Sequence, residues 1–201
     1  MRTLSPPLTG SRPLPPPRTT SQVPLEAALE QRRSVRSFLP DPLTEEEIGQ
    51  LLWAAQGVTE PTGHRTAPSA GALYPLELYA VTPDAVLHYE PAAHAVAVRL
   101  EGDYRPPLQA AAWGQDPVGE APVTFVIAAV VERTAVKYGE RASRYVQLEA
   151  GHAAQNILLQ AAALGLGAVP IGAFRDDQLA ALLELPRAER PLYLVPVGHA
   201  R

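Results

Sequence analysis

Alternating apolar and polar residues predict strands along much of the chain. "LELYAVTP" at 76–83 is typical of a strand, and "AVLHYEPAAHAVAVRL" at 85–100 contains two alternating runs around a Pro-Ala-Ala turn, which predicts a hairpin. "VTFVIAAVV" at 123–131 is a continuous run rich in β-branched residues and predicts a strand buried on both faces. Two further strands are predicted for "AVPIGAF" at 168–174 and "PLYLVPVGHAR" at 191–201.

Other segments show apolar residues at helical spacing. A helix is predicted to begin at Leu25, and a second one follows Thr44, which forms a capping-box pattern with Glu47. "RYVQLEAGHAAQNILLQAAALGLG" at 144–167 is apolar almost all round and predicts a long helix buried in the protein or at a subunit interface. "DDQLAALLEL" at 176–185 predicts a short helix. Because helices and strands are mixed rather than strictly alternating, the fold class is expected to be α+β.

Composition changes this picture mainly at the N-terminus. Residues 1–24 hold seven prolines and predict an extended arm, which leaves residues 25–201 as the folded domain. A length of 201 residues fits one domain, or two small ones, at roughly 100 to 200 residues each. The hydrophobic fraction of 46% is that of a globular protein, and no apolar run reaches the roughly 18 residues of a membrane span.

Several chemistries are excluded by missing residue types. The chain has no cysteine, which rules out a thiol nucleophile, a disulfide and a cysteine-ligated metal centre. The five histidines show no metal-ligand spacing. A net charge of −4 argues against nucleic-acid binding. With no apolar stretch of signal-peptide length at the start, we expect a cytoplasmic protein.

The cluster Arg32-Arg33-Ser34-Val35-Arg36 is the first candidate binding site. Guanidinium groups match phosphate oxygens in a bidentate manner, and a serine hydroxyl adds another donor. A phosphate site is one interpretation of this cluster. The alternative is a solvated basic surface without a ligand.

The stretch "PSAGALYP" is the second candidate, because five small or rigid residues in a row leave the main chain accessible. A flat ligand could pack on this backbone and use its N–H and C=O groups, or the segment could be a tight turn before the next strand. The five residues are Pro68, Ser69, Ala70, Gly71 and Ala72. A similar surface, or simply a glycine at a bulge, is predicted at Gly172 and Ala173 after Pro170.

Lysine is almost absent. Of 17 basic residues, Lys137 is the only one that is not arginine. Lysine differs from arginine in that burial can lower its pKa enough for it to act as a base. Lys137 is therefore either a functional residue or a chance survivor on a surface loop.

In their combination and order these segments resemble the FMN-dependent nitroreductases. Within that family they resemble the branch of SagB-type, thiazole- and oxazole-forming peptide dehydrogenases. The resemblance extends from about residue 25 to the end and rests on five collinear blocks: "RRSVRSF", "LLWAAQGVT", "RTAPSAGALYPLELYAV", "KYGERASRYVQLEAGHAAQNILLQAAALGLGAVPIGAF" and "LYLVPVGHAR". It implies an α+β nitroreductase-like fold with a mixed central β-sheet flanked by helices. It also implies an intertwined homodimer with one FMN at each of two interface sites.

The resemblance also assigns roles to individual residues. Arg32 and Ser34 correspond to phosphate contacts, with Arg33 adjacent and Arg201 as a further candidate. Arg36 corresponds to a cation near the flavin pyrimidine edge, where positive charge favours the reduced ring. The backbone contacts on the pyrimidine side, expected from the partner subunit, correspond to Pro68, Ser69 and Ala70, followed by Gly71 and Ala72.

The strand near flavin N5 corresponds to Pro170, Ile171 and Gly172. Two departures from the family pattern affect these contacts. Ala72 stands where many nitroreductases carry asparagine, and Gly172 stands where many carry glutamate. A main-chain N–H would therefore have to supply any hydrogen bond to N5.

Lys137 and Tyr138 resemble a Lys-Tyr pair that assists proton removal in the azoline-oxidising branch; the alternative is that the dipeptide only closes a loop. We expect an FMN-dependent oxidoreductase that works by ping-pong transfer to a small organic acceptor. The chain lacks a Walker or G-x-G-x-x-G motif, so a donor such as NAD(P)H would visit the flavin pocket transiently. The alternatives are an azoline dehydrogenase acting on a modified peptide beside a cyclodehydratase, and a flavin-binding or interaction module without turnover.

Overall fold

The strands of the protein pair into one sheet in the order β1-β4-β3-β2-β5-β7-β6. The structure is a computed structural model that describes residues 10–201. The strands are β1 (Arg12–Pro13), β2 (Leu76–Val81), β3 (Ala85–Glu90), β4 (Ala95–Glu101), β5 (Val123–Ala129), β6 (Gly167–Ala168) and β7 (Arg190–Gly198). Every ladder between these strands is antiparallel, and an isolated bridge between Ser34 and Ala168 is parallel.

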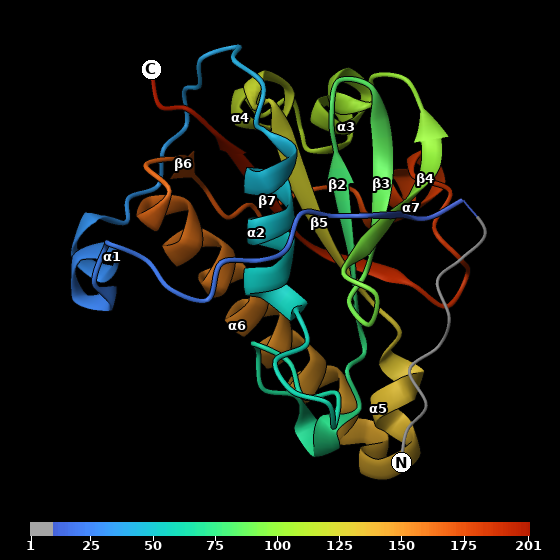
Figure 1. The fold of residues 1–201 in the computed structure, drawn as a ribbon. Helices are drawn as coiled ribbons and strands as arrows, with labels where there is room; N and C mark the ends of the chain where they lie inside the picture. Colours follow the sequence, from blue (N-terminus) through green and yellow to red (C-terminus); the bar gives the residue numbers. More distant parts are fainter. Residues whose placement is uncertain (1–9) are drawn as a thin grey trace.

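Helices cover both faces of this sheet (Figure 1). They are α1 (Leu25–Gln31), α2 (Glu45–Gln56), α3 (Arg105–Ala111), α4 (Asp116–Glu120), α5 (Val131–Tyr138), α6 (Ala142–Ala163) and α7 (Asp176–Leu182), with short 3-10 turns η1 (Ala70–Ala72) and η2 (Gly139–Arg141). The α2 and α6 helices pack on one face, whereas α3, α4 and α7 pack on the other. The expected α+β class is confirmed.

The sheet is buried on both sides because its strands are apolar at successive positions. In β2, Leu76, Leu78 and Ala80 point into the core beneath α2 and α6, while Tyr79 and Val81 point into the core on the opposite face. All seven residues of β5 are buried, as its continuous apolar run predicted. The capping box predicted at Thr44 and Glu47 is present at the start of α2.

Some predicted elements differ from the structure. The helices α3, α4 and α5 were not predicted. The strand predicted for 168–174 is wrong over most of its length: the β6–β7 ladder involves only Gly167–Ala168, and beyond it a single bridge joins Ile171 to Leu194. Pro196 of β7 accepts the Val169 N–H at 3.2 Å but has no N–H to donate in return, which interrupts the ladder there.

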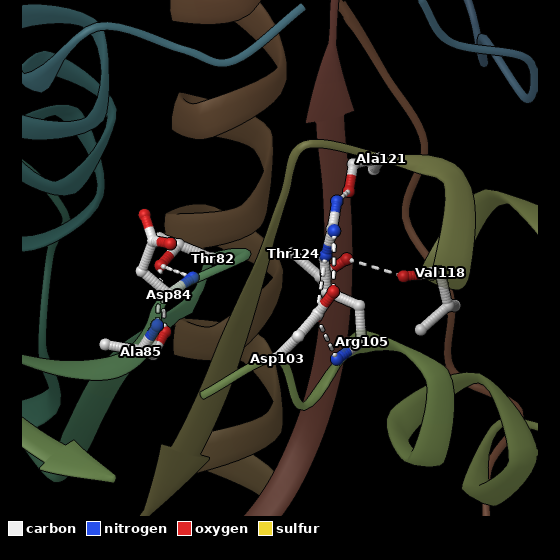
Figure 2. A network of polar contacts seen from close by, with 8 residues as sticks. All are labelled: Thr82, Asp84, Ala85, Asp103, Arg105, Val118, Ala121 and Thr124. Atoms are coloured by element: carbon white, nitrogen blue, oxygen red, sulfur yellow. Dashed lines mark hydrogen bonds and ion pairs between the residues drawn. The ribbon is translucent and has the colours of Figure 1, made fainter. Parts of the chain in front are cut away.

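A polar network fastens the unpredicted α3–α4 segment to the end of the sheet (Figure 2). The Arg105 guanidinium bonds Asp103 through two nitrogens at 2.9 and 2.7 Å and donates to the Ala121 carbonyl at 3.3 Å. The Thr124 hydroxyl donates to the Val118 carbonyl at 3.3 Å. These contacts join the first turn of α3 and the body of α4 to the start of β5.

Residues 10–24 lie against the same chain. Beyond the short β1–β4 ladder, Leu14 donates its N–H to the His94 carbonyl at 2.9 Å, and the His94 ring nitrogen Nε2 lies 2.9 Å from the Pro15 carbonyl oxygen. Leu14 is buried. Residues 1–9 of the predicted arm lie outside the described residues.

Within the isolated chain, the long helix α6 is buried along one side only. Its inward stripe, including Val146, Ala150, Ala153 and Ile157, is buried in the core. The opposite stripe is exposed in the isolated chain and consists of Ser143, Arg144, Gln147, Leu148, Gly151, His152 and Gln155. Over the part of the chain that the structure describes, no helix has the length and apolarity needed to cross a membrane.

Candidate functional site

Isolated bridges join Ser34 to Ala168 of β6 and Phe38 to Ala200, so the arginine-rich segment after α1 lies beside β6 and the end of the chain. The α1 helix, β6 and the C-terminus lie on one side of the molecule (Figure 1). We call Arg32, Arg33, Ser34, Arg36 and Arg201 the basic edge. Backbone bonds hold it in place: Val35 donates to the Ala168 carbonyl at 3.0 Å, and Arg201 donates to the Ser37 carbonyl at 3.1 Å. Gly167 allows the segment that contains Val35 to lie this close to β6, because a Cβ at residue 167 would lie 2.7 Å from the Val35 Cβ.

The basic edge has strong positive charge without acidic partners. Within residues 10–201, none of its four guanidinium groups forms an ion pair with a carboxylate. Arg33 donates to the carbonyls of Glu30 at 2.6 Å and Arg32 at 2.8 Å, and Arg36 to that of Ser34 at 3.5 Å. Arg32 is half-buried and lines a cavity of about 200 Å³. The arrangement suits an anionic ligand.

The predicted N5 segment runs antiparallel beside the middle of β7. Ile171 donates to the Leu194 carbonyl at 2.8 Å, which fixes the segment after Pro170. Gly172 is exposed, and its N–H bonds to no described residue. Gln115 donates to the Ala173 carbonyl at 2.8 Å, so the segment is also held from the α4 side.

The second predicted binding segment, Pro68–Ala72, is a turn with unusual backbone angles; we call it the PSAGA turn. Gly71 has φ 63°, and the non-glycine residues Ala72 and Tyr74 have φ 53° and 48°. Such angles carry a steric cost for residues with a Cβ and persist only where other contacts hold them. One such contact is the Tyr74 N–H, which donates to Ser69 Oγ at 2.9 Å.

The predicted catalytic pair lies against this turn. A Cβ at Gly71 would lie 3.1 Å from Lys137 Nζ and 3.1 Å from the Tyr138 hydroxyl oxygen. Arg133, one turn earlier on α5, pairs with Glu77 of β2 at 2.5 Å and donates to the Tyr74 carbonyl at 3.3 Å. The α5 helix is thereby tied to the PSAGA turn.

The two parts of the candidate site lie at opposite ends of α6. The PSAGA turn is beside Glu149, near the start of the helix, whereas Arg32 shares its cavity with Ala162, near the end. These positions are 13 residues apart, or about 20 Å along a helix with a rise of about 1.5 Å per residue. Within one chain the structure brings Arg32–Arg36 together with 167–172 and Arg201, and Pro68–Ala72 together with Lys137 and Tyr138, but it does not bring these two groups together.

Sequence reasoning missed a buried acid at the PSAGA turn. Glu149 is only 3% exposed, and its carboxyl lies beside the Ser69 side chain. Burial raises the pKa of the Glu149 carboxyl to about 7, while the nearby Ser69 hydroxyl and the charge of Arg65 act in the opposite direction. Its spacing from Val146, Ala150 and Ala153 places it on the apolar stripe of α6, and this signal could have identified it.

Among residues 10–201 no group of histidine and acidic side chains is arranged to hold a metal ion.

Comparisons with known proteins agree with this fold. The family model described as the nitroreductase family matches residues 29–199. A candidate nitroreductase of Methanocaldococcus jannaschii is 43% identical over 183 residues, which cover 88% of this chain and 91% of that protein. The protein named FMN reductase [NAD(P)H] of Bacillus subtilis is 26% identical over 86% of this chain and 64% of its own length.

Solved structures extend the similarity. The crystal structure of a candidate nitroreductase from Ralstonia eutropha is 33% identical, covers 96% of this chain and 90% of its own, and superposes with a TM-score of 0.86. The microcin synthetase McbBCD complex of E. coli, with truncated pro-MccB17 bound, contains a chain that is 25% identical over 85% of this chain and 70% of its own, with a TM-score of 0.75.

Fold and sequence together define an oxidoreductase enzyme. The chain belongs to the nitroreductase family, in which dependence on FMN is typical.

Proposed function

We propose that the protein is an FMN-dependent oxidoreductase that takes reducing equivalents from NAD(P)H and passes them to a small organic acceptor in a second half-reaction. Each FMN site is formed by the basic edge of one protomer and the PSAGA turn of its partner. The observation that carries this proposal is the basic edge, whose four guanidinium groups have no carboxylate partner among the described residues. The similarity to FMN reductase supports the same choice of cofactor and donor.

The residues present fit FMN at both ends of the molecule. Arg32, Arg33 and Ser34 supply charge-assisted donors suited to a phosphate group. The exposed, small residues Gly172 and Ala173 and the PSAGA turn leave room for a flat ring. Charge and shape therefore agree with the two parts of this cofactor.

When bound, FMN would supply reversible hydride transfer. Arg36 would place positive charge where it favours the reduced form, and the Gly172 N–H, which bonds to no described residue, would be available as a donor to the ring. Lys137 and Tyr138 lie next to Gly71 and would hold or move a proton only in the oxidation of an azoline substrate.

The composite site requires a homodimer. A single protomer leaves the basic edge and the PSAGA turn about 20 Å apart along α6, too far for one ring system to touch both. The exposed stripe of α6 includes Leu148, which is 54% exposed, and on α1 Leu25 and Leu29 are 61% and 52% exposed. Apolar side chains on these faces favour burial against a second copy.

The test is cofactor retention. The purified protein should carry or take up FMN, with a flavin visible spectrum, and Arg32→Ala should weaken binding by about 10- to 150-fold, because a hydrogen bond to a charged group contributes about 1.5 to 3 kcal/mol. Arg187→Ala, at an exposed arginine away from the basic edge, serves as the matched control. A colourless wild-type protein that takes up no added FMN would instead support the module without turnover.

A second candidate function, an azoline peptide dehydrogenase working beside a cyclodehydratase, is favoured by the contact of Lys137 and Tyr138 with Gly71. The similarity to a chain of the McbBCD complex, solved with a truncated peptide bound, supports the same alternative. Loss of azoline oxidation in Lys137→Ala with FMN binding intact would favour it. Unchanged turnover of small acceptors in that variant would favour the first proposal.

A further inference from the structure

Glu149 occupies an unusual position for an acid. It projects from the inward stripe of α6 towards the PSAGA turn and is only 3% exposed. The Ser69 side chain lies beside this carboxyl, and the Glu149 Oε1 atom has no hydrogen-bond partner among the described residues. A buried carboxyl with an unsatisfied oxygen is costly to keep, which indicates that it has a use.

Ser69 connects this carboxyl to the shape of the turn. Its Oγ accepts the Tyr74 N–H at 2.9 Å, across the residues with left-handed backbone angles. A hydroxyl has one hydrogen to donate and two lone pairs that accept. Since one lone pair is used by Tyr74, the Ser69 hydrogen and the second lone pair remain for Glu149 or for a ligand.

We propose that Glu149 is a positioning residue that sets the direction of the Ser69 hydroxyl. With its proton in place, Glu149 donates to the second lone pair of Ser69 Oγ, and the Ser69 hydrogen can then be donated to a ligand lying over the PSAGA turn. As a carboxylate, Glu149 accepts that hydrogen itself. The inference rests on the proposed function, in which the ligand acceptor is a carbonyl oxygen of the FMN ring, and it makes cofactor binding depend on pH.

The surroundings of Glu149 indicate that it gains or loses its proton near neutral pH. Burial raises the pKa of its carboxyl to about 7, and the charge that acts on it directly is that of Arg65, from the segment after α2. Arg65 is in turn influenced by Glu77 of β2, Arg133 of α5 and Tyr74. Lys137 and Tyr138 lie on the other side of the turn, next to Gly71.

The experiment measures the Kd of FMN for the apoprotein by fluorescence between about pH 5.5 and pH 8.5, a range that spans the Glu149 pKa of about 7. In the wild type, binding should weaken by about 2- to 13-fold over this range, the equivalent of one hydrogen bond. Glu149→Gln carries an amide that donates to Ser69 at every pH, so it should keep the tight value throughout. Ser69→Ala should bind weakly throughout.

Glu140→Gln, at an exposed acid in η2, is the matched control and should follow the wild type. Dividing each Kd by the value for Ser69→Ala at the same pH removes the titration of the FMN phosphate, because that variant lacks the hydroxyl that Glu149 would direct. A Glu149→Gln variant that keeps the wild-type pH dependence would overturn the proposal.

A readout on the apoprotein separates this proposal from the proposed function. If the wild type binds no FMN, the proposed function fails, and infrared difference spectra then decide the role of Glu149. The carbonyl band of a neutral carboxylic acid that disappears as the pH rises through about 7, and that is absent in Glu149→Gln, supports it. Absence of this band in the wild type overturns it.

Discussion

Replacing Gly151 by alanine tests whether the exposed stripe of α6 is covered by a second copy. Gly151 lies in the interior of α6, and a Cβ there would meet no atom of residues 10–201 within 4 Å apart from the neighbouring backbone of the helix itself. In a solvent-exposed helix interior, Gly→Ala stabilises by about 1 kcal/mol. For a chain of this size that raises Tm by about 2 to 4 °C.

At a close helix–helix interface the same methyl group has the opposite effect. Overpacking costs about 1 to 3 kcal/mol, and twofold symmetry repeats it, so the dimer would lose about 2 to 6 kcal/mol. We therefore expect Gly151→Ala to raise the dimer dissociation constant by about 30-fold or more, measured by sedimentation over a concentration series. Val136→Ala, at a position on α5 that is 83% exposed, is the control for helix propensity. A Gly151→Ala protein that melts higher and keeps its oligomeric state would refute the α6 interface.

Two further predictions concern the PSAGA turn. Gly71→Ala should destabilise the fold by about 1 to 2 kcal/mol, because alanine is disfavoured at φ 63°, and it should also weaken FMN binding by displacing Lys137 and Tyr138. The control is Gly63→Ala, at φ 88° with no described atom within 4 Å of the new Cβ, which should show the backbone cost alone. Equal FMN affinity in the two variants would contradict the assignment of the PSAGA turn to the site. The Glu149 carboxyl has a pKa of about 7 in the folded protein against 4.5 as its ordinary value, so its contribution to stability is complete below about pH 4.5 and is lost as the pH rises through about 7. Urea unfolding should show the wild type losing up to about 3 kcal/mol relative to Glu149→Gln between about pH 5 and pH 8, and parallel curves would contradict the assigned burial.

Local patterns were sufficient for elements whose residues carry their own signals. The β3–β4 hairpin, the buried strand β5 and the capped start of α2 follow from alternation, β-branched content and the Thr44–Glu47 pair. The missed helices lack such signals. The α3 sequence "RPPLQAA" has prolines in its first turn, which also fit a loop, and α5 begins at Val131 within the apolar run that continues β5.

The candidate site shows the same limit at the level of tertiary structure. Residue types and order were enough to single out the basic edge, the PSAGA turn and Lys137. No local pattern could predict that the basic edge and the PSAGA turn lie at opposite ends of α6. Their separation depends on how distant segments of the chain pack against that helix. Glu149 was missed because its proposed role depends on its position beside Ser69, which lies 80 positions away in the chain.

The separation of the two half-sites leads to a complementation experiment. In the proposed shared site, Arg32→Ala would impair the basic edge and Gly71→Ala the PSAGA turn, so a dimer of either variant alone would have two defective FMN sites. In a mixed dimer, one site combines both defects, whereas the other combines the intact edge of one protomer with the intact turn of its partner. Random reassociation makes about half of the dimers mixed, so about a quarter of all sites should recover wild-type FMN affinity.

If each site were instead built within one protomer, every site in every dimer would carry a defect, and mixing would restore nothing. A single-chain site would also require the basic edge and the PSAGA turn to meet around one ring, although α6 holds them about 20 Å apart. Titrating FMN into the mixture, with each variant alone as control, distinguishes the two arrangements by the number of tight sites rather than by an average affinity. Failure to recover tight sites in a mixture shown by mass spectrometry to contain mixed dimers would therefore contradict the shared site itself, whatever the identity of the acceptor.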